Sequence, residues 1–241
     1  MSQDRIYSTP HGAVKDFAFD EQVADVFNDM INRSVPGYTT ILHTLGKLAP
    51  RFAKSGSRIY DLGCSLGAAS LAIKRSVDIE GVELIAVDSS AAMISRAERQ
   101  LAAYKGKVEV SLKEADIRDI DIENASLVVL NFTLQFLPQD DRDALINKIY
   151  AGLRPGGLLL LSEKLVFADS AINDLLSELH WDFKRDNGYS ELEIAQKRTA
   201  IENVMRPDSP EIHLKRLKGA GFSHSQFWYQ CYNFASLVAI K

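Results

Sequence analysis

The sequence predicts an α/β fold with a mostly parallel, seven-stranded sheet, helices on both faces and an antiparallel hairpin at the C-terminus. Three observations lead to this prediction. Short apolar runs alternate with helical patterns from residue 58 onward, as they do in βαβ units. A glycine-bearing turn follows the first of these runs. Two β-rich runs lie only two residues apart at the end of the chain, which is typical of a hairpin.

Two amphipathic helices are predicted before the first strand. Residues 1–36 show no strand pattern, but apolar side chains recur within them at helical spacing. Those side chains are Val23, Val26, Phe27, Met30 and Ile31. We therefore expect 1–36 to be a helical segment that covers a ligand, and 37–241 to be the main domain. The second helix is expected over Tyr38–Phe52, where apolar residues gather on one face.

Five strands and their connecting helices are predicted next. The strands are Arg58–Leu62, Glu83–Val87, Val108–Lys113, Leu127–Asn131 and Leu158–Ser162. Helices are expected between them, such as Ala91–Tyr104 and Asp140–Leu153. The latter should end at residues 154–157, Arg-Pro-Gly-Gly, because proline cannot continue a helix and glycine permits the turn into the next strand.

A long polar and helical insertion, at about 167–206, follows the fifth strand. Insertions of this length near the carboxyl edge of a sheet are usually lids or oligomer contacts. Its apolar residues, such as Leu175 and Trp181, lead us to expect a homodimer built partly from this insertion. After it, Ser209 and Pro210 predict the start of a helix that Gly221 ends. The hairpin strands are then Ser225–Cys231 and Phe234–Ile240.

The composition is close to the average for soluble globular proteins, with 46% hydrophobic and 25% charged residues. Its 241 residues suffice for one domain with a full core. No apolar run approaches the roughly 20 residues that span a bilayer, and the N-terminus has no apolar signal region. We therefore expect a cytoplasmic protein without a membrane partner.

The net charge argues against a nucleic-acid-binding protein, and the spacing of the cysteines and histidines argues against a disulfide-rich or metal-binding protein. The formal net charge is −4, whereas gripping a polyphosphate backbone needs clustered lysines and arginines, so no direct nucleic acid binding is expected. Cys64 and Cys231 lie far apart in the sequence, and the histidines show no metal-like clustering. Neither a disulfide framework nor a metal site is therefore expected.

The strongest chemical signal is the turn at residues 61–67, Asp-Leu-Gly-Cys-Ser-Leu-Gly. It follows a predicted strand and opens a helix, where a nucleotide site in an α/β sheet needs glycine for a tight turn and a close approach of the ligand. A purely structural turn is the alternative. Asp88 stands at the end of the next strand, about 20 residues further on, where a carboxylate accepts hydrogen bonds from ribose hydroxyls. Alternatively, Asp88 caps the following helix, a task that Ser89 or Ser90 would also perform.

Two later strand ends add candidate ligand contacts. Asp116 follows the third strand, where its carboxylate would accept a hydrogen bond from an adenine amino group while Ile117 packs on the ring. A solvated loop acid is the alternative. Asn131 ends the fourth strand, at the edge where ligands bind in open α/β sheets, or else it caps the next turn.

Together, these motifs, their order and the closing hairpin resemble the class I S-adenosylmethionine-dependent methyltransferase family over about residues 38–241. The resemblance implies a Rossmann-like methyltransferase fold, and the hairpin distinguishes it from a dehydrogenase. One position departs from the family pattern. The usual acidic-x-Gly-x-Gly-x-Gly motif has Ser65 in place of its middle glycine.

A closer resemblance runs nearly the full length of the chain. The segments that support it are Leu62–Gly67, Asn131–Phe136, Gln196–Arg198 and Phe227–Phe234. In these segments the chain resembles the bacterial carboxy-S-adenosyl-L-methionine synthase family. The resemblance implies an enzyme that makes carboxy-S-adenosyl-L-methionine from S-adenosylmethionine and prephenate and releases phenylpyruvate. The product would serve a partner tRNA carboxymethyltransferase in wobble uridine modification.

The same resemblance implies a set of residues that line the ligand. They are Tyr38, Gly63, Cys64, Ser65, Asp88, Ser89, Asp116, Ile117, Asn131 and Arg198. Arg198 is the implied catalytic residue, because a guanidinium beside a sulfonium repels it unless an anion lies between them. The carboxylate on the transferred carbon would be that anion. Judged from its own segment alone, Arg198 is an exposed helix residue.

The implied chemistry is a carboxyl transfer, in which the deprotonated sulfonium methyl captures carbon dioxide released from prephenate. No side chain in the sequence stands out as the base, and the hydroxide that leaves prephenate would serve. Two alternatives stay open. An ordinary S-adenosylmethionine-dependent methyltransferase acting on a small molecule or RNA would keep the fold and most of the pocket. A non-catalytic S-adenosylmethionine-binding protein would act through partner contacts instead.

Overall fold

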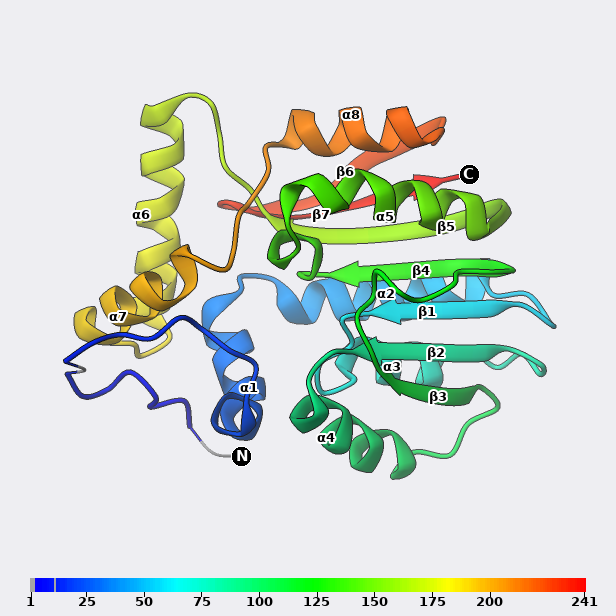
Figure 1. The fold of residues 1–241 in the computed structure, drawn as a ribbon, viewed down its shortest axis with the longest axis horizontal. Coiled ribbons are helices and arrows are strands. Elements are labelled where there is room, and N and C mark those ends of the chain that lie inside the picture. The colour runs from blue at the N-terminus through cyan, green and yellow to red at the C-terminus, as the bar shows by residue number, and fades with distance from the viewer. Residues whose placement is uncertain (1–2, 11) are drawn as a thin grey trace.

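The computed structural model describes residues 3–10 and 12–241, and over these residues seven strands form one sheet in the order β3-β2-β1-β4-β5-β7-β6 (Figure 1). The strands are β1 Arg58–Leu62, β2 Glu83–Asp88, β3 Glu109–Glu114, β4 Ala125–Asn131, β5 Leu153–Lys164, β6 His224–Cys231 and β7 Phe234–Ile240. Strands β1 to β5 pair in parallel, and β7 runs antiparallel to both β5 and β6. The predicted fold class is therefore confirmed, including the C-terminal hairpin.

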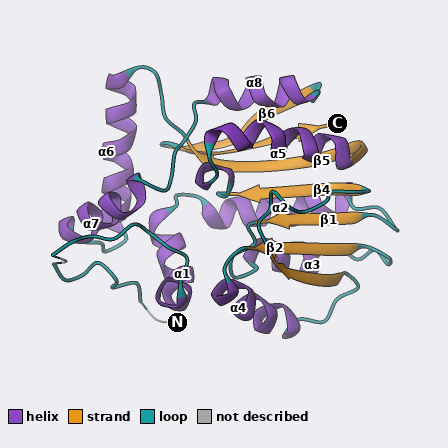
Figure 2. Cartoon of the chain, viewed as in Figure 1, coloured by secondary structure: helices purple, strands orange, loops and turns teal. Residues whose placement is uncertain are grey.

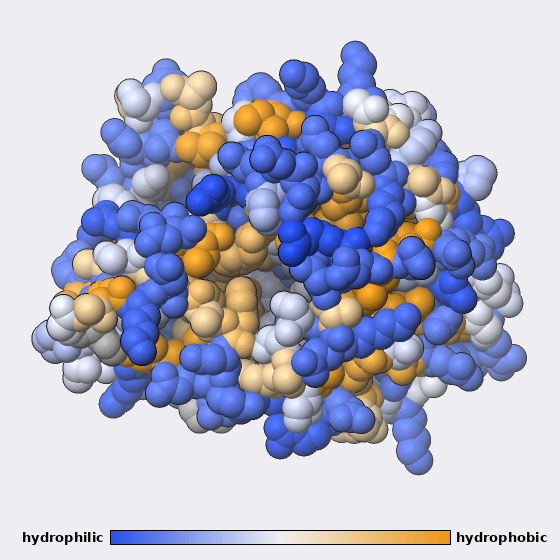
Figure 3. Space-filling model, viewed as in Figure 1, coloured by the Kyte–Doolittle hydropathy of each residue, from blue (hydrophilic) through white to orange (hydrophobic). Residues whose placement is uncertain are grey.

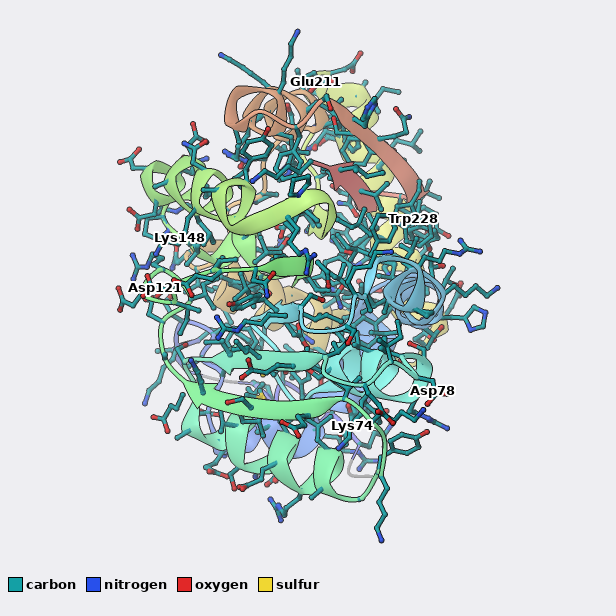
Figure 4. The ribbon with its side chains drawn as sticks, turned by 90° about the vertical axis from the view of Figure 1, so that its right-hand side faces the viewer. Lys74, Asp78, Asp121, Lys148, Glu211 and Trp228 are labelled. Carbon is teal, nitrogen blue, oxygen red and sulfur yellow. The ribbon has the colours of Figure 1, made fainter. Side chains whose placement is uncertain are left out.

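Helices cover both faces of the sheet. They are α1 Glu21–Ser34, α2 Tyr38–Phe52, α3 Ala68–Ser76, α4 Ala91–Ala102, α5 Gln139–Gly152, α6 Ser170–Asp186, α7 Glu191–Glu202 and α8 Pro210–Ala220, with a short 3-10 turn, η1, at Leu134–Phe136. Figure 4 looks along the strands and shows Lys148 of α5 and Lys74 of α3 on opposite sides of the sheet. No helix in the described part of the chain has the length and apolar character needed to cross a membrane.

Each face of the sheet has its own apolar core. On one face, Tyr60, Val128 and Leu130 pack with side chains of α5 and α8. On the other, Ile59 and Leu127 pack with side chains of α2 and α3. Because neighbouring residues of a strand face opposite sides, a strand buried on both faces has no polar side. Strand β4 shows this pattern, since every residue before Asn131 is buried.

Local signals set the ends of several helices. The Ser209 side chain accepts a hydrogen bond from the backbone of Ile212, Pro210 occupies the first turn, and Gly221 ends α8 with a left-handed φ of 111°. This agrees with the helix predicted there. The Ser90 side chain caps α4 by accepting a hydrogen bond from Met93 N–H (3.3 Å). Each such cap contributes about 1 kcal/mol.

Two predicted segments differ from the structure by more than two residues, whereas the bounds of the other elements agree within two residues. Strand β5 begins at Leu153 and not at Leu158, since Leu153 already pairs with Ala125. The Pro155-Gly156 turn does not separate helix from strand but lies within β5, where the register shifts and Gly156 N–H bonds to Lys241 O (2.9 Å). In the N-terminal segment, α1 at residues 21–34 confirms the helix predicted from the spacing of Val23 to Ile31, while the rest of 1–36 that the structure describes is not helical. Residues 1, 2 and 11 of that segment lie outside the described residues.

The carboxyl ends of the parallel strands meet at one edge of the sheet, which α1, α6, α7 and the N-terminal loop cover (Figures 1 and 2). The loop before α1 is tied to α7, because Phe17 N–H donates to Ala200 O (2.9 Å) and the Gln196 side chain donates to Tyr7 O (2.9 Å). Chain order reverses between β1 and β4, which is where open α/β sheets bind ligands.

Candidate functional site

A cavity of about 420 Å³ lies at this carboxyl edge. Its volume is within the range of about 300–1,000 Å³ typical of small-molecule sites. Figure 3 shows the surface hollowed here, with apolar side chains around the hollow. The ends of strands β1 to β5 form one part of its wall, and helices α1, α6 and α7 form another, with further residues from the loop before α1, η1 and β7.

The glycine turn after β1 brings the backbone to the cavity. Gly63 has a φ of 80°, and a Cβ at this position would lie 2.3 Å from Thr133 Cγ2, so a larger residue does not fit. Gly63 and Cys64 both donate backbone hydrogen bonds to Val87 O, at 2.8 and 2.9 Å. Ser65 replaces the usual glycine yet adopts the left-handed region itself, with a φ of 49°. The departure from the family motif therefore preserves the shape of the turn.

Asp88 ends β2 and is held in place by backbone donors. Its Oδ2 accepts from Ser65 N–H (2.8 Å), and its Oδ1 accepts from Ser90 N–H (2.9 Å). Burial raises the pKa of this carboxyl group, while these hydrogen bonds oppose the rise. Asp88 lines the cavity together with Ser89, and Ser90 is the cap of α4. The carboxylate thus presents its remaining lone pairs on a rigid strand end.

Asp116 lines the cavity beside Arg118 and Ile117. Its carboxylate accepts from the Arg118 guanidinium through both oxygens, with Arg118 Nε 3.0 Å from Oδ1 and Nη2 2.6 Å from Oδ2. These bonds hold the pKa of Asp116 below its usual value. Arg118 also contacts Asp141 at 2.5 Å, so the loop after β3 is fixed from two sides. Ile117 is buried and adds an apolar surface.

Asn131 contributes an unused acceptor at the end of β4. Its Oδ1 is buried and has no hydrogen-bond partner among the described residues, while the residue lines the cavity. A buried acceptor without a partner costs about 1–3 kcal/mol. A ligand N–H group at this position would remove that cost.

Three predicted site residues do not line the cavity in a single copy of the chain: Tyr38, Cys64 and Arg198. Tyr38 packs beneath it against Phe132, with ring centroids 6.5 Å apart, and burial raises the pKa of its phenol. Cys64 is buried, and burial likewise raises the pKa of its thiol. Cys64 therefore contributes its backbone to the turn rather than a thiolate.

Arg198 lies on the exposed side of α7. Its side chain is 51% exposed, forms an ion pair with Glu202 (3.4 Å) and lies over the Trp181 ring at 5.2 Å. Its neighbours Lys197 and Ile201 do line the cavity. In a single copy of the chain, Arg198 is therefore an exposed helix residue, as its own sequence segment predicts.

The structure also places residues in the cavity wall that the sequence analysis did not identify. They are chiefly Lys164, Lys184, Lys197 and His180, with the aromatic residues Phe17, Phe19 and Phe136. No motif marks these lysines, because they come from three separate elements. The only local signal is the spacing of His180 and Lys184, which puts both on one face of α6.

Comparisons with known proteins agree with this architecture. A family model described as "Methyltransferase domain" matches residues 59–157. A relative from Shewanella sp. (strain MR-7) is 60% identical over 240 residues, which cover 100% of this chain and 99% of that protein. A relative from Vibrio cholerae serotype O1 (strain M66-2) is 61% identical over 239 residues, or 99% and 97% of the two chains. Both relatives are named carboxy-S-adenosyl-L-methionine synthase.

Solved structures show the same fold at low sequence identity. Human N-acetylserotonin methyltransferase in complex with S-adenosylmethionine superposes with a TM-score of 0.60 and 18% identity, over 92% of this chain and 55% of that one. A second structure, described as a putative S-adenosyl-L-methionine-dependent methyltransferase from Methanococcus maripaludis, superposes with a TM-score of 0.58 and 20% identity. The match covers 96% of this chain and 97% of that one. These structures support the fold alone.

Proposed function

We propose that this chain, which belongs to the carboxy-S-adenosyl-L-methionine synthase family, makes carboxy-S-adenosyl-L-methionine from S-adenosylmethionine and prephenate and releases phenylpyruvate. The observation that supports this most directly is the identity of about 60% over the whole chain to relatives of that name. The membership makes the protein an enzyme with S-adenosylmethionine as a substrate. Prephenate as the second substrate is our proposal.

The strand ends from β1 to β4 would hold the nucleoside and the amino acid part of S-adenosylmethionine. In this arrangement Asp88 accepts hydrogen bonds from the ribose hydroxyls, as acidic residues at this place in nucleotide sites do. Asp116 accepts from the adenine amino group, and Ile117 packs on the adenine ring. Asn131 Oδ1, which has no hydrogen-bond partner among the described residues, accepts from the ammonium group. Gly63 lets the ligand approach the turn closely.

The chemistry balances without an added oxidant or base. The sulfonium group of S-adenosylmethionine makes its own methyl group acidic, and carbon dioxide from prephenate ends on that carbon. The proton of the methyl group combines with the hydroxide that leaves prephenate, so the products are phenylpyruvate, water and the carboxylated sulfonium. The protein would orient the two substrates and exclude water, which are established sources of rate enhancement.

Arg198 would bind the transferred carboxylate across an interface between two copies of the chain. Because Arg198 does not line the cavity of its own chain, we assign this role to Arg198 of the partner subunit in a homodimer. Arg198→Ala should weaken binding of carboxy-S-adenosyl-L-methionine by roughly 30-fold or more and leave S-adenosylmethionine binding nearly unchanged, since only the former has the carboxylate. Calorimetry with both ligands tests the role, and equal losses for both would contradict it. A monomeric mass in light scattering would contradict the interface.

The product would pass to a tRNA carboxymethyltransferase that modifies the wobble uridine, in the cytoplasm. The net charge of −4 suits an enzyme that leaves tRNA binding to this second protein.

The decisive experiment is to incubate the purified protein with S-adenosylmethionine and prephenate and to analyse the products by mass spectrometry. Formation of carboxy-S-adenosyl-L-methionine and phenylpyruvate in equal amounts is the expected result. S-adenosylhomocysteine as the only nucleoside product, together with a methylated acceptor, would instead identify an ordinary methyltransferase. Binding without turnover would identify a non-catalytic S-adenosylmethionine-binding protein.

A further inference from the structure

Three lysines from three different elements line one end of the cavity. Lys164 ends β5, Lys184 lies on α6 and Lys197 lies on α7. Burial lowers the pKa of all three lysines, and the charges of Lys197 and Lys164 lower the pKa of Lys184 further. We call Lys164, Lys184 and Lys197 the lysine cluster.

The side chains around the lysine cluster are connected by short contacts. Lys197 Nζ donates to Ser34 Oγ (3.0 Å), and the same serine accepts from His180 Nε2 through its backbone oxygen (2.8 Å). The His180 ring packs against Phe234 with centroids 4.7 Å apart. Lys164 Nζ lies 6.0 Å from the centre of the Phe234 ring. The cluster is therefore one site and not three separate surface charges.

The described residues provide too few negatively charged partners to neutralise the lysine cluster. Lys184 is only 9% exposed, yet neither it nor Lys164 forms an ion pair or side-chain hydrogen bond with any residue that the structure describes. Lys197 lies 3.6 Å from the buried Asp4. Glu202, which also acts on Lys164, is paired with Arg198. Buried lysines are normally paired, so this arrangement is expected only where a ligand brings negative charge.

His180 adds a neutral acceptor beside these cations. Burial and the neighbouring lysines lower its pKa to about 2, so its ring is uncharged. The ring nitrogen that faces the Ser34 oxygen must carry the hydrogen, because a carbonyl oxygen only accepts. Nδ1 is then an acceptor, and it is buried without a partner among residues 3–10 and 12–241. A hydroxyl group on a ligand would satisfy it.

We propose that the lysine cluster and His180 form the subsite for the second substrate, a hydroxylated dicarboxylate, with the lysines binding its carboxylates and His180 Nδ1 accepting from its hydroxyl group. This inference rests on the proposed function and names the residues that select the substrate. Prephenate has both features, and it is the probe used below.

The place of the subsite in the sheet separates it from the nucleoside. Asp88 and Asp116 follow β2 and β3, on one side of the chain reversal between β1 and β4. Lys164 ends β5, on the other side of that reversal. Both walls belong to the same cavity, so a second substrate bound at the lysine cluster would lie next to the cofactor. The alternative is that the lysines bind the carboxylate of S-adenosylmethionine itself.

The test measures prephenate binding to protein saturated with S-adenosylhomocysteine, which has no methyl group to react. Lys164→Met and Lys184→Met keep the length of the side chain and remove its charge. Each should weaken prephenate binding by about 10-fold or more in calorimetry, because breaking a buried charged contact costs much of the binding free energy. Affinity for S-adenosylhomocysteine should stay within about twofold, as expected for a separate subsite. Lys197 is unsuitable for the test, because it also holds Ser34 near Asp4.

Lys215→Met is the matched control. Lys215 is exposed on α8, does not line the cavity and has no ion pair or hydrogen bond within the described chain, so this variant should bind prephenate as the wild type does. Thermal unfolding checks that the cluster variants fold. Their melting temperatures should not fall, because methionine removes a buried charge without shortening the chain.

The outcomes separate the subsite from the proposed function. If the wild type makes carboxy-S-adenosyl-L-methionine and both cluster variants bind prephenate normally, the subsite is overturned and the proposed function stands. If the variants lose affinity for S-adenosylhomocysteine and not for prephenate, the lysines bind the amino acid carboxylate of the nucleoside and the inference is also overturned. A wild type that neither binds nor converts prephenate would overturn both.

Discussion

The two ends of the cavity differ in how their polar groups are satisfied. At the strand ends of β2 and β3, the carboxylates of Asp88 and Asp116 already accept hydrogen bonds from Ser65, Ser90 and Arg118. In the lysine cluster, Lys164 and Lys184 have no such partners in the described chain. The protein therefore holds the carboxylates of the first end in place, whereas the lysines of the second end lack partners and would be neutralised by an anionic ligand. Substitutions that remove acceptors at the first end should lower stability, whereas neutral substitutions of the lysines at the second should weaken ligand binding without lowering stability.

The largest expected effect on stability belongs to the glycine turn. Gly63→Val should lower the free energy of unfolding by about 4 kcal/mol or more, since the left-handed backbone disfavours a branched side chain and its Cβ would overlap Thr133. Urea unfolding measures the change. Gly219→Ala is the control, because Gly219 lies in α8 with open space around it and alanine should add about 0.5–1 kcal/mol there. Equal effects of the two substitutions would contradict a rigid turn.

Asp88→Ala should reduce both ligand affinity and stability. We expect a loss of about 2–4 kcal/mol in S-adenosylmethionine binding if the proposed ribose contacts form, and of about 1–3 kcal/mol in unfolding free energy from the two backbone donors left without an acceptor. Calorimetry and urea unfolding measure the two quantities. Unchanged affinity per folded molecule would show that Asp88 acts only as a structural acceptor.

The lysine cluster should make the ligand-free protein more stable at higher pH. Burial and the charges of Lys197, Lys164 and Arg198 lower the pKa of Lys184 from 10.5 to about 7, while His180 beside it is neutral and Asp4 faces Lys197. Below pH 7, Lys184 is charged in both the native and the unfolded chain, so the full cost of burying its charge lowers the free energy of unfolding. Between pH 7 and pH 10.5 the native chain loses this proton while the unfolded chain keeps it, and the cost of burial therefore falls as the pH rises. The unfolding free energy should rise by about 2 kcal/mol between pH 7 and pH 9.

Lys184→Met should remove most of that rise. A smaller slope should remain from Lys197, whose pKa burial lowers to about 8. Denaturant unfolding at several pH values tests both statements, and a wild type whose stability is flat from pH 7 to pH 9 would show that Lys184 is paired in solution.

The smallest expected effect is at Ser65. Ser65→Gly should change the unfolding free energy by less than about 1 kcal/mol, with a slight gain, because relief of the left-handed backbone offsets the greater freedom of glycine in the unfolded chain. Cofactor affinity should hold, since the backbone N–H that binds Asp88 is retained. A large loss of S-adenosylmethionine affinity in calorimetry would show that the Ser65 hydroxyl binds the ligand.

The fold and the cavity wall formed by the ends of β1 to β4 were predictable from the sequence, because their signals are local. The turn at 61–67 and the acids after β2 and β3 each follow a strand within a few residues, and parallel strands bring their carboxyl ends to one edge. Ser209 and Gly221 likewise marked the ends of α8 through backbone geometry that depends only on neighbouring residues. The early start of β5 was missed, because Pro155 and Gly156 favour a turn locally while pairing with β4 continues the ladder.

The other end of the cavity was decided by tertiary structure alone. Lys164, Lys184 and Lys197 come from β5, α6 and α7, and no spacing in the sequence shows that they meet. In a sequence a lysine is most often a solvated surface residue, and the same holds for Arg198, which the single chain does leave exposed. Which charges are buried together depends on how α6 and α7 pack over the carboxyl edge of the sheet. That packing brings together residues distant in sequence, and local patterns do not record it.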